Sequence, residues 1–373
     1  MNTRFIILLS LLMCMGGLNA QTLGDFNPKE DRGAYGPRKF PSKDVFIANF
    51  SVNFEVFNWR TAATKGGIVG NTLMGDTKAS LAVGLDIPEA TLQQITDEAY
   101  AQFVAELKAQ GFNVLNADAA ANTGYYSEYQ RIDNMGMSLS EAPGVLTVYP
   151  SNTPFFVKGF DKSGKIKREG MFSVIGLADR DDEISSYPKL SQELNDATII
   201  NADMYILFLD INKPYQGNGA NLTANTNLRL NEYGVLKSRV ETNTSPSITN
   251  KIGLTAPGSK EVTATAKTSI VFVAGRNKIG GSPLGTYHGV LKEDLVIKGV
   301  LAKEKIEAHA QTDTDNIGTE TAFGRMYRAD NISVKNTALI HADAQKYEAG
   351  VKESVNTFLK HHVGEFKTKF FKK

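Results

Sequence analysis

The stretch from Val45 to Asn116 constrains the fold more than any other part of the chain. Pro88 suits the first turn of a helix, and Gly111 can take the left-handed conformation that ends one. Between them, apolar residues recur at spacings of three to five and form one stripe: Ile87, Leu92, Ile95, Ala99, Phe103 and Leu107. The pattern predicts an amphipathic helix that must cover another apolar surface.

That surface is predicted to be a β-sheet. Residues 45–57 alternate aromatic and β-branched side chains before the helix, and residues 112–115 form a short strand after it. Residues 204–210 are almost continuously apolar, which is typical of a central strand covered on both faces. A second helix is predicted over residues 338–363, where apolar residues recur at three and four. We therefore predict an α+β fold with helices packed on one side of a mixed β-sheet and with additional β-hairpins.

The first twenty residues have the pattern of a secretory signal peptide. Arg4 precedes an apolar run from Phe5 to Met15, and small residues lead to Ala20, the expected cleavage site. The only cysteine, Cys14, lies inside this run and follows Met13, whereas a lipoprotein cleavage site requires a small residue there. The mature chain is therefore expected to lack cysteine, which excludes disulfides, thiolate metal sites and a cysteine nucleophile.

The charge balance argues against a nucleic-acid partner. Cleavage after Ala20 removes Arg4 from the 41 basic residues, so that basic and acidic residues balance at 40 each. No later window approaches the roughly 18 apolar residues of a spanning helix, so the chain is expected to be peripheral to a membrane at most.

The predicted organisation follows from these patterns. Residues 21–44 are an extended leader, either a tether or a disordered start, because they are polar and rich in glycine and proline. One α+β domain spans residues 45–363, with inserts at 65–85 and 145–180. Residues 364–373 are a basic-aromatic tail, which suits either a membrane interface or a frayed helix end.

Two groups of residues are candidate contact sites for a protein or another ligand. The insert at 65–85 contains Gly66, Gly67 and Gly70, which permit close backbone approach in a contact loop or a plain surface hairpin. The tyrosines Tyr125, Tyr126 and Tyr129 would bind sugars or proteins if exposed, and would otherwise pack in the core.

Motifs for catalysis or metal binding are not convincing. Residues 159–165 nearly match a phosphate-binding loop, but Ile166 replaces the required Ser or Thr and a strand is expected to follow. The acidic run at 179–183 lacks the pattern of a calcium loop, and the five histidines form no metal-binding motif. We predict no catalytic, cofactor-binding or metal-binding residues, although a hydrolase with carboxylates far apart in the sequence stays open.

The order of elements resembles the CsgG family of curli-secretion-type envelope proteins. The resemblance is carried by the strand 45–50, the helix ending at 103–107, the strand 111–115, the buried strand after Ala202, and the closing helix with Val351 and Leu359. It covers about half of the mature chain. It implies a periplasmic domain that acts in assembly or secretion at the outer membrane, often in rings. Members of the secretion branch are lipoproteins, a feature that the position of Cys14 does not support.

These observations predict a non-enzymatic cell-envelope scaffold or secretion and assembly accessory that acts through protein–protein contacts. Its expected location is the periplasm or the inner face of the outer membrane, and its expected partners are other envelope proteins or further copies in a homo-oligomer. A secreted or periplasmic module that binds glycan or peptidoglycan is the alternative. Fold resemblance alone does not decide between them.

Overall fold

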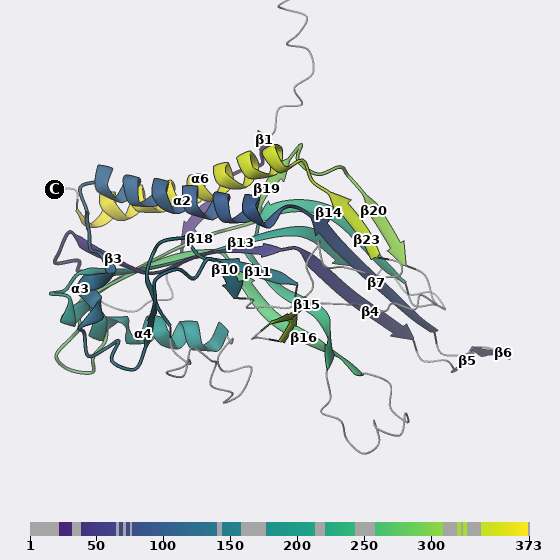
Figure 1. The fold of residues 1–373 in the computed structure, drawn as a ribbon, viewed down its shortest axis with the longest axis horizontal. Coiled ribbons are helices and arrows are strands. Elements are labelled where there is room, and N and C mark those ends of the chain that lie inside the picture. Colours follow the sequence, from purple (N-terminus) through teal and green to yellow (C-terminus); the bar gives the residue numbers. More distant parts are fainter. Residues whose placement is uncertain are drawn as a thin grey trace, which may run out of the picture.

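A computed structural model describes residues 22–31, 39–64, 67–69, 72–74, 77–139, 144–157, 177–212, 221–242, 258–308, 319–321, 324–326 and 337–371. Its centre is a twelve-stranded sheet (Figure 1). Two parallel neighbours, β3 (Asp44–Glu55) and β13 (Thr198–Asn212), form its middle. Most of their residues are buried, as expected for strands covered on both faces.

The strands beside this pair lie end to end in rows. β17 (Ser269–Ala274) and β14 (Leu222–Leu230) pair with successive stretches of β13 along one edge. The next row contains β18 (Gly285–Leu291), β19 (Leu295–Lys298) and β20 (Lys305–Ala308). The last row on this side is β2 (Pro28–Glu30) and β1 (Thr22–Leu23). On the far edge of β3 lie β8 (Asn113–Val114) and β11 (Val145–Val148), and β11 also pairs with β10 (Met137–Leu139).

Smaller sheets extend this body. One contains β4 (Phe57–Thr64), β7 (Thr77–Asp86) and β23 (Thr337–His341), and β5 (Gly67–Val69) pairs with β6 (Thr72–Met74) between β4 and β7. A long hairpin joins β15 (Tyr233–Thr242) to β16 (Gly258–Lys267). Two further pairs are β9 (Gln130–Ile132) with β12 (Phe155–Val157), and β21 (Thr319–Thr321) with β22 (Gly324–Met326).

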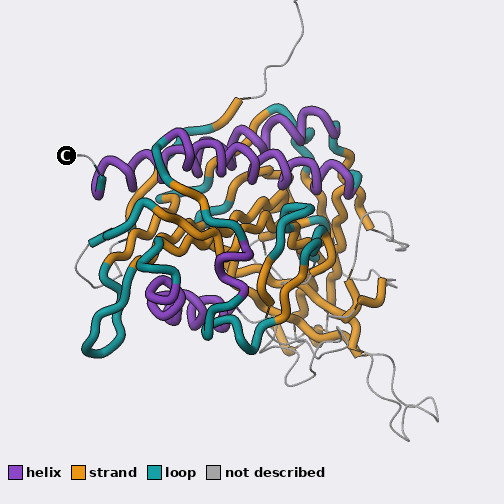
Figure 2. Tube along the Cα trace, turned by 60° about the vertical axis from the view of Figure 1, so that its left-hand side comes forward, coloured by secondary structure: helices purple, strands orange, loops and turns teal. Residues whose placement is uncertain are grey.

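The helices α2 (Glu89–Ala109) and α6 (Ala344–Phe370) lie side by side over one face of the sheet (Figure 2). The stripe predicted on the first helix is buried there, which confirms that prediction. Both helices pack on alternate residues of the central strands, such as Ile200, Ala202 and Phe272, and form the main core. The C-terminal turn of α6 ends the core with stacked aromatic rings, since Phe366 lies 4.2 Å from Phe272 between ring centroids.

The opposite face of the sheet is covered as well. α4 (Leu177–Glu193) packs Tyr187 and Leu190 against Ile199 and Val271, and α3 (Ala117–Ala121) adds Ala120 to the same cluster. Farther along this face, the hairpin β15–β16 covers residues of β11 and β13. The face is therefore closed by a helix at one end and by strands at the other.

The predicted fold class is wrong. The structure is mostly antiparallel β-sheet with four described helices, and these helices lie on both faces rather than on one side. In the described part, the parallel pairings are β3 with β13, β3 with β8, and β7 with β23. The physical reason is that β13 and β17 carry apolar residues at successive positions, so both faces must be covered.

The predicted leader, second insert and tail can also be located in the structure. Residues 22–31 of the predicted leader carry β1 and β2, and residues 145–157 of the second predicted insert carry β11 and β12. The predicted tail continues α6 to Phe370, and its Phe366 is fully buried. Residues 1–20 lie outside the described residues. No helix of the described part is long and apolar enough to cross a membrane.

Gly144 offers a test of the bend between β3 and β4. Its carbonyl accepts hydrogen bonds from Val56 and Phe57, its φ is +76°, and an added Cβ would lie 1.9 Å from the Phe57 carbonyl oxygen. Gly280 has nearly the same φ, +77°, with no atom within 4 Å of an added Cβ. We expect Gly280→Ala to lower the unfolding free energy by about 1 kcal/mol and Gly144→Ala to lower it by at least ~2 kcal/mol more, because only the latter adds a clash. Urea unfolding measures both, and equal losses would contradict the close approach.

A buried histidine on α6 predicts acid sensitivity. The Tyr287 hydroxyl lies 2.7 Å from Nδ1 of the fully buried His362. Burial, and next the neighbouring His361, lower the pKa of His362 to about 3 from its ordinary value of 6.5. Burial likewise lowers the pKa of His288 to about 4.

Because the unfolded chain takes up these protons below about pH 6.5 and the folded chain does not, stability falls as the pH drops from about 6.5 toward 3. Each pH unit costs up to about 1.4 kcal/mol for each histidine. We expect His362→Gln to reduce this acid slope without abolishing it, since His288 still contributes. Urea unfolding between pH 7 and pH 4 gives the slopes, and an unchanged slope in the variant would argue against the buried neutral imidazole.

Candidate functional site

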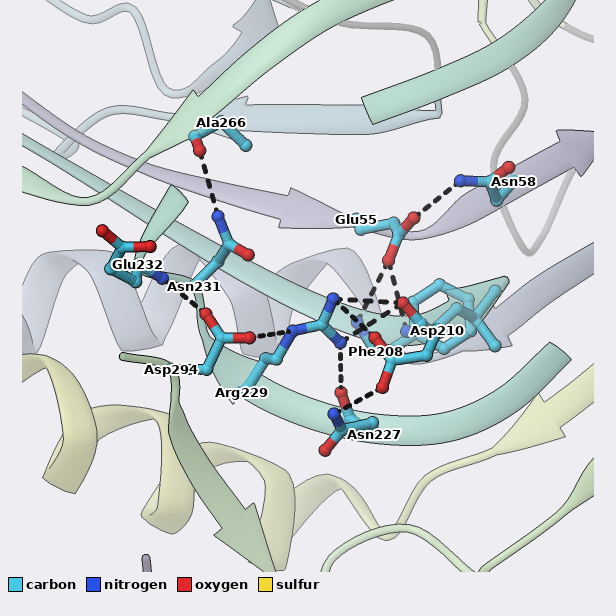
Figure 3. Close-up of polar contacts among 11 residues, drawn as sticks. Glu55, Asn58, Phe208, Asp210, Asn227, Arg229, Asn231, Glu232, Ala266 and Asp294 are labelled. Atoms are coloured by element: carbon cyan, nitrogen blue, oxygen red, sulfur yellow. Dashed lines mark hydrogen bonds and ion pairs between the residues drawn. The ribbon is translucent and has the colours of Figure 1, made fainter. Parts of the chain in front are cut away.

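The most distinctive polar arrangement lies where two hairpins leave the main sheet. β3 ends at Glu55, and after Val56 the chain continues into the β4–β7 hairpin. β14 ends at Leu230, and after Asn231 and Glu232 the chain continues into the β15–β16 hairpin. Both departures are held by one polar network with four buried members, Glu55, Asn58, Arg229 and Asn231, and four half-buried ones. We call it the root network: Glu55, Asn58, Asp210, Asn227, Arg229, Asn231, Glu232 and Asp294 (Figure 3).

Glu55 binds the backbone of an irregular point in β13. The pairing of β13 with β14 shifts register between Leu207 and Leu209: β13 advances by two residues while β14 advances by three, from Arg229 to Thr226, so the extra residue of this β-bulge lies in β14. The amides of Phe208 and Leu209 donate to Glu55 Oε2 at 3.1 and 3.3 Å. Asn58 Nδ2, on β4, donates to Glu55 Oε1 at 2.9 Å. The carboxylate therefore binds two amides of β13 opposite the bulge and ties them to the first residues of the β4–β7 hairpin.

Arg229 occupies the other side of the same bulge. Its position in β14 lies between Leu228 and Leu230, which pack in the main core, so its side chain lies on the opposite face. The guanidinium donates through Nη1 and Nη2 to the Leu209 carbonyl, at 3.2 and 3.3 Å. Its ion pairs are with Asp210 at 2.9 Å and Asp294 at 3.0 Å. These pairs join β13, β14 and the residue before β19.

The second hairpin is held by the same groups. The amide of Glu232 donates to Asp294 Oδ1 at 2.7 Å, so Asp294 binds both Arg229 and the backbone just before β15. Asn231 Nδ2 donates to the Ala266 carbonyl on β16 at 3.0 Å, and the Asn231 amide donates to the Tyr205 carbonyl on β13. The direction in which β15–β16 leaves the sheet is thus fixed by side chains of the root network.

Burial dominates the electrostatics of Glu55. Loss of water raises the pKa of Glu55 above its ordinary 4.5, while the hydrogen bond from Asn58, the charge of Arg229 and the two β13 amides oppose that rise. Tyr347 of α6 is also fully buried, its hydroxyl has no hydrogen-bond partner among the described residues, and burial followed by the Glu55 charge raises its pKa. A buried acid with a raised pKa is common in active sites, but here both carboxylate oxygens are engaged by the fold itself.

The two hairpins also contact each other. The Trp59 amide on β4 donates to Ser238 Oγ on β15 at 3.1 Å, and Arg60 Nη1 donates to the Lys237 carbonyl at 3.2 Å. Within the first hairpin, Trp59 Nε1 donates to Ser80 Oγ on β7 at 2.7 Å. We call β4–β7, with β5 and β6 between them, and β15–β16 the two arms. They lie side by side from their common root.

The predicted glycine site lies on the first arm. Gly67 is the first residue of β5 and pairs with Met74 of β6, whereas Gly66 and Gly70 lie outside the described residues. Figure 1 shows β5 and β6 at the far end of this arm, beyond the ends of α2 and α6. The stretch predicted as an insert therefore contains β5 and β6 at the far end of the arm and nearly all of β7, which returns to the root, where the Leu85 amide donates to the Val56 carbonyl.

The predicted tyrosine site lies elsewhere, under α4. Tyr125 and Tyr126 are buried and Tyr129 is half-buried, and the three rings pack on one another with centroids 4.9 to 5.5 Å apart. Tyr126 also stacks on Phe156 at 4.1 Å. The tyrosines thus fill the second core, and the structure does not bring them together with the glycines of the arm.

The root network was not predicted from the sequence. Glu55 lies at the end of a mostly apolar strand, and the backbone amides of Phe208 and Leu209 that it binds are 153 and 154 positions away in the sequence. Arg229 and its partner Asp294 come from two further stretches of the chain. The one available signal was a charged residue at the end of a strongly apolar strand, which indicates a paired buried charge. Among the described residues, no group of three or more His, Cys, Asp or Glu is placed to hold a metal ion.

Comparisons with known proteins gave no match: no protein-family model, no curated protein and no solved structure is significantly similar to the chain.

The raised pKa of Glu55 predicts that the free energy of unfolding depends on pH, and that a neutral side chain of the same shape removes this dependence. Because the folded chain binds this proton more tightly than the unfolded chain, stability falls as the pH rises from about 4.5 through the raised pKa and then levels off. We expect Glu55→Gln to lose this component and to keep the fold, since its amide oxygen can still accept from the two β13 amides. Glu55→Ala should cost ~3 kcal/mol or more, because the backbone amides of Phe208 and Leu209 and the side-chain amide of Asn58 lose their acceptor. Urea unfolding of the three proteins from pH 4 to pH 8 measures both effects, and near-equal stability of the Gln and Ala variants would refute the role of the carboxylate.

Proposed function

We propose that the protein is a non-enzymatic scaffold or assembly accessory of the cell envelope, and that it binds other proteins through its two arms. The observation that carries this proposal is the single root network from which both arms leave the sheet side by side. Such a network holds the arms in one orientation before any partner binds. Preorganisation of this kind lowers the entropy cost of association, so it favours a contact role.

The surface of the second arm supports the same proposal. Tyr233 is 55% exposed and Val235 is 50% exposed, and residues two apart on a strand point to the same face. Tyrosine is enriched at protein interfaces because its ring is large, rigid and amphipathic. Their cross-strand partners are Lys267 and Thr265, which gives the patch a polar rim on β16.

The location and the class of partner rest on the sequence. Residues 1–20 have the signal-peptide pattern, and the order of elements resembles envelope proteins of the CsgG family. The proposal therefore places the chain in the periplasm or at the inner face of the outer membrane, with envelope proteins as partners. The burial of Tyr125 and Tyr126 removes an exposed tyrosine surface that would serve a protein or a sugar, so the proposal rests on the arms.

Shortening the first arm tests the contact role. Thr64 and Thr77 are register partners, so residues 65–76 can be replaced by Asn-Gly, which closes a two-residue hairpin turn. We expect this variant to keep the thermal stability of the wild type, because the root network stays intact, and to lose most of its partner capture. The readout is affinity purification from native envelope membranes, followed by partner identification and native mass measurement of the complexes.

The matched control changes an exposed residue of a different turn. Ile279, between β17 and β18, is 92% exposed, and Ile279→Ser should leave capture unchanged. Tyr233→Ser with Val235→Ser should weaken capture through the second arm. Equal capture by the wild type and both arm variants would contradict the proposal, and retention of a strict monomer on insoluble peptidoglycan would favour the glycan-binding alternative.

A further inference from the structure

The N-terminal segment Thr22–Asp31, which we call the strap, forms the outermost row of the main sheet. Its strand β1 pairs with β19 and its strand β2 pairs with β18, so one extended segment covers the edge of two strands that lie end to end. Between them, the Gly24 amide donates to the Val296 carbonyl at 2.7 Å and the Lys292 amide donates to the Asn27 carbonyl at 2.8 Å. Without the strap, this edge would present unpaired backbone groups, which is the usual template for another strand.

The strap is held lightly compared with what it covers. None of its ten residues is buried, whereas Val290, Leu291, Leu295 and Ile297 of the strands beneath it are. Its aromatic contact is Phe26 against His361, with ring centroids 5.4 Å apart. Detachment of the strap exposes two half-buried apolar side chains, Leu23 and Phe26, that pack against the main core, whereas the fully buried residues of the sheet edge keep their own packing.

The strap forms ion pairs with three different parts of the chain. Glu30 pairs with Lys369 at 3.0 Å, Asp31 pairs with Lys267 at 3.2 Å, and Lys29 approaches Glu232 at 3.8 Å. Acidic and basic residues of the strap thus meet opposite charges on α6, on β16 and just before β15. A segment that replaces the strap must offer the same order of charges behind an aromatic residue.

We propose that the strap is exchangeable, and that the sheet edge along β18 and β19 binds the strap of a second copy of this chain. Every one of these contacts joins the strap to residues more than 200 positions away in the sequence, so an identical segment from another copy can make all of them. A second copy is the partner whose sequence carries the matching charges and the aromatic residue. This inference concerns the sheet edge along β18 and β19; two of the strap's ion pairs reach the base of the second arm, but the tests below change no residue of either arm.

The geometry offers a covalent test of which copy supplies the strap. A Cβ added at Gly24 would lie 3.5 Å from the Cβ of Val296, which is within the range of disulfides. The variant carries Gly24→Cys and Val296→Cys in a Cys14→Ser background, so that only these two thiols are present. A strap bound to its own chain closes a disulfide within the chain, whereas an exchanged strap joins two chains.

The chain's own strap competes with the strap of another copy for the sheet edge, at an effective concentration on the order of mM. The folded protein is therefore incubated near that concentration before mild oxidation. We expect non-reducing electrophoresis to show a dimer band that grows with protein concentration, and to show far less of it in either single-cysteine variant. A bridge that stays within the chain at every concentration would overturn the proposal.

A second measurement uses the wild type, in case the double variant does not fold. Glu30 and Lys369 are close enough for a zero-length carbodiimide cross-link. Folded copies labelled with ¹⁴N and ¹⁵N are mixed, incubated and cross-linked, and the joined peptides are analysed by mass spectrometry. Mixed-isotope Glu30–Lys369 peptides support exchange, and exclusively same-isotope peptides exclude it.

Discussion

The architecture depends on one constraint: β13 is apolar on both faces along most of its length. Ile200, Ala202 and Met204 pack under α2 and α6, while Ile199 packs under α4 and Leu207 packs under the β15–β16 arm. A strand of this kind is stable only in the middle of a three-layer arrangement, because exposing either face would lose roughly 25 cal/mol for each Å² of apolar surface. The helices and hairpins around it are the covers that this strand requires.

The root network lies where that arrangement changes. Along β13 the cover on the second face passes from a helix to a hairpin, and the β-bulge opposite Leu207–Leu209 marks the region where both arms begin. Burying the charges of Glu55 and Arg229 there is expensive, and well-packed apolar residues in place of buried charges are often as stable. An apolar pair could not accept from the amides of Phe208 and Leu209, or donate to the Leu209 carbonyl. The charges are therefore explained by the need to fix the direction of two hairpins, since they add no clear net stability.

The sequence predicted the parts of the fold that depend on local periodicity. The helix predicted between Pro88 and Gln110 is α2, and the apolar run at 204–210 lies inside the central strand β13. The second helix was placed too early, because residues 337–341 form β23 and the helix then runs on to Phe370. Its last aromatic residues looked like a tail by composition, yet they pack on Phe40, Phe112 and Phe272 from distant segments.

The features that could not be predicted are those that depend on pairing over long distances. α4 has only a short apolar stripe and contains Pro188, so its sequence did not indicate a cover for the second face, and the fold class was misjudged for that reason. Strand β14 has four Thr and Asn residues, and its strand character comes from its neighbours rather than from its own pattern. The root network joins residues from four separate stretches of the chain, and no spacing rule connects them.

The strap and the arms differ in how they are attached to the main sheet. An unpaired edge row promotes association with other chains, and a lightly bound segment of the same chain covers that row here. The arms instead extend β-structure away from the sheet and depend on buried charges at their root. The strap, with no buried residue, opens by exposing only half-buried side chains, whereas the arms can change direction only if Glu55 and Arg229 lose their partners. Contacts made through the strap should therefore be reversible, and contacts made through the arms should depend on a fixed geometry.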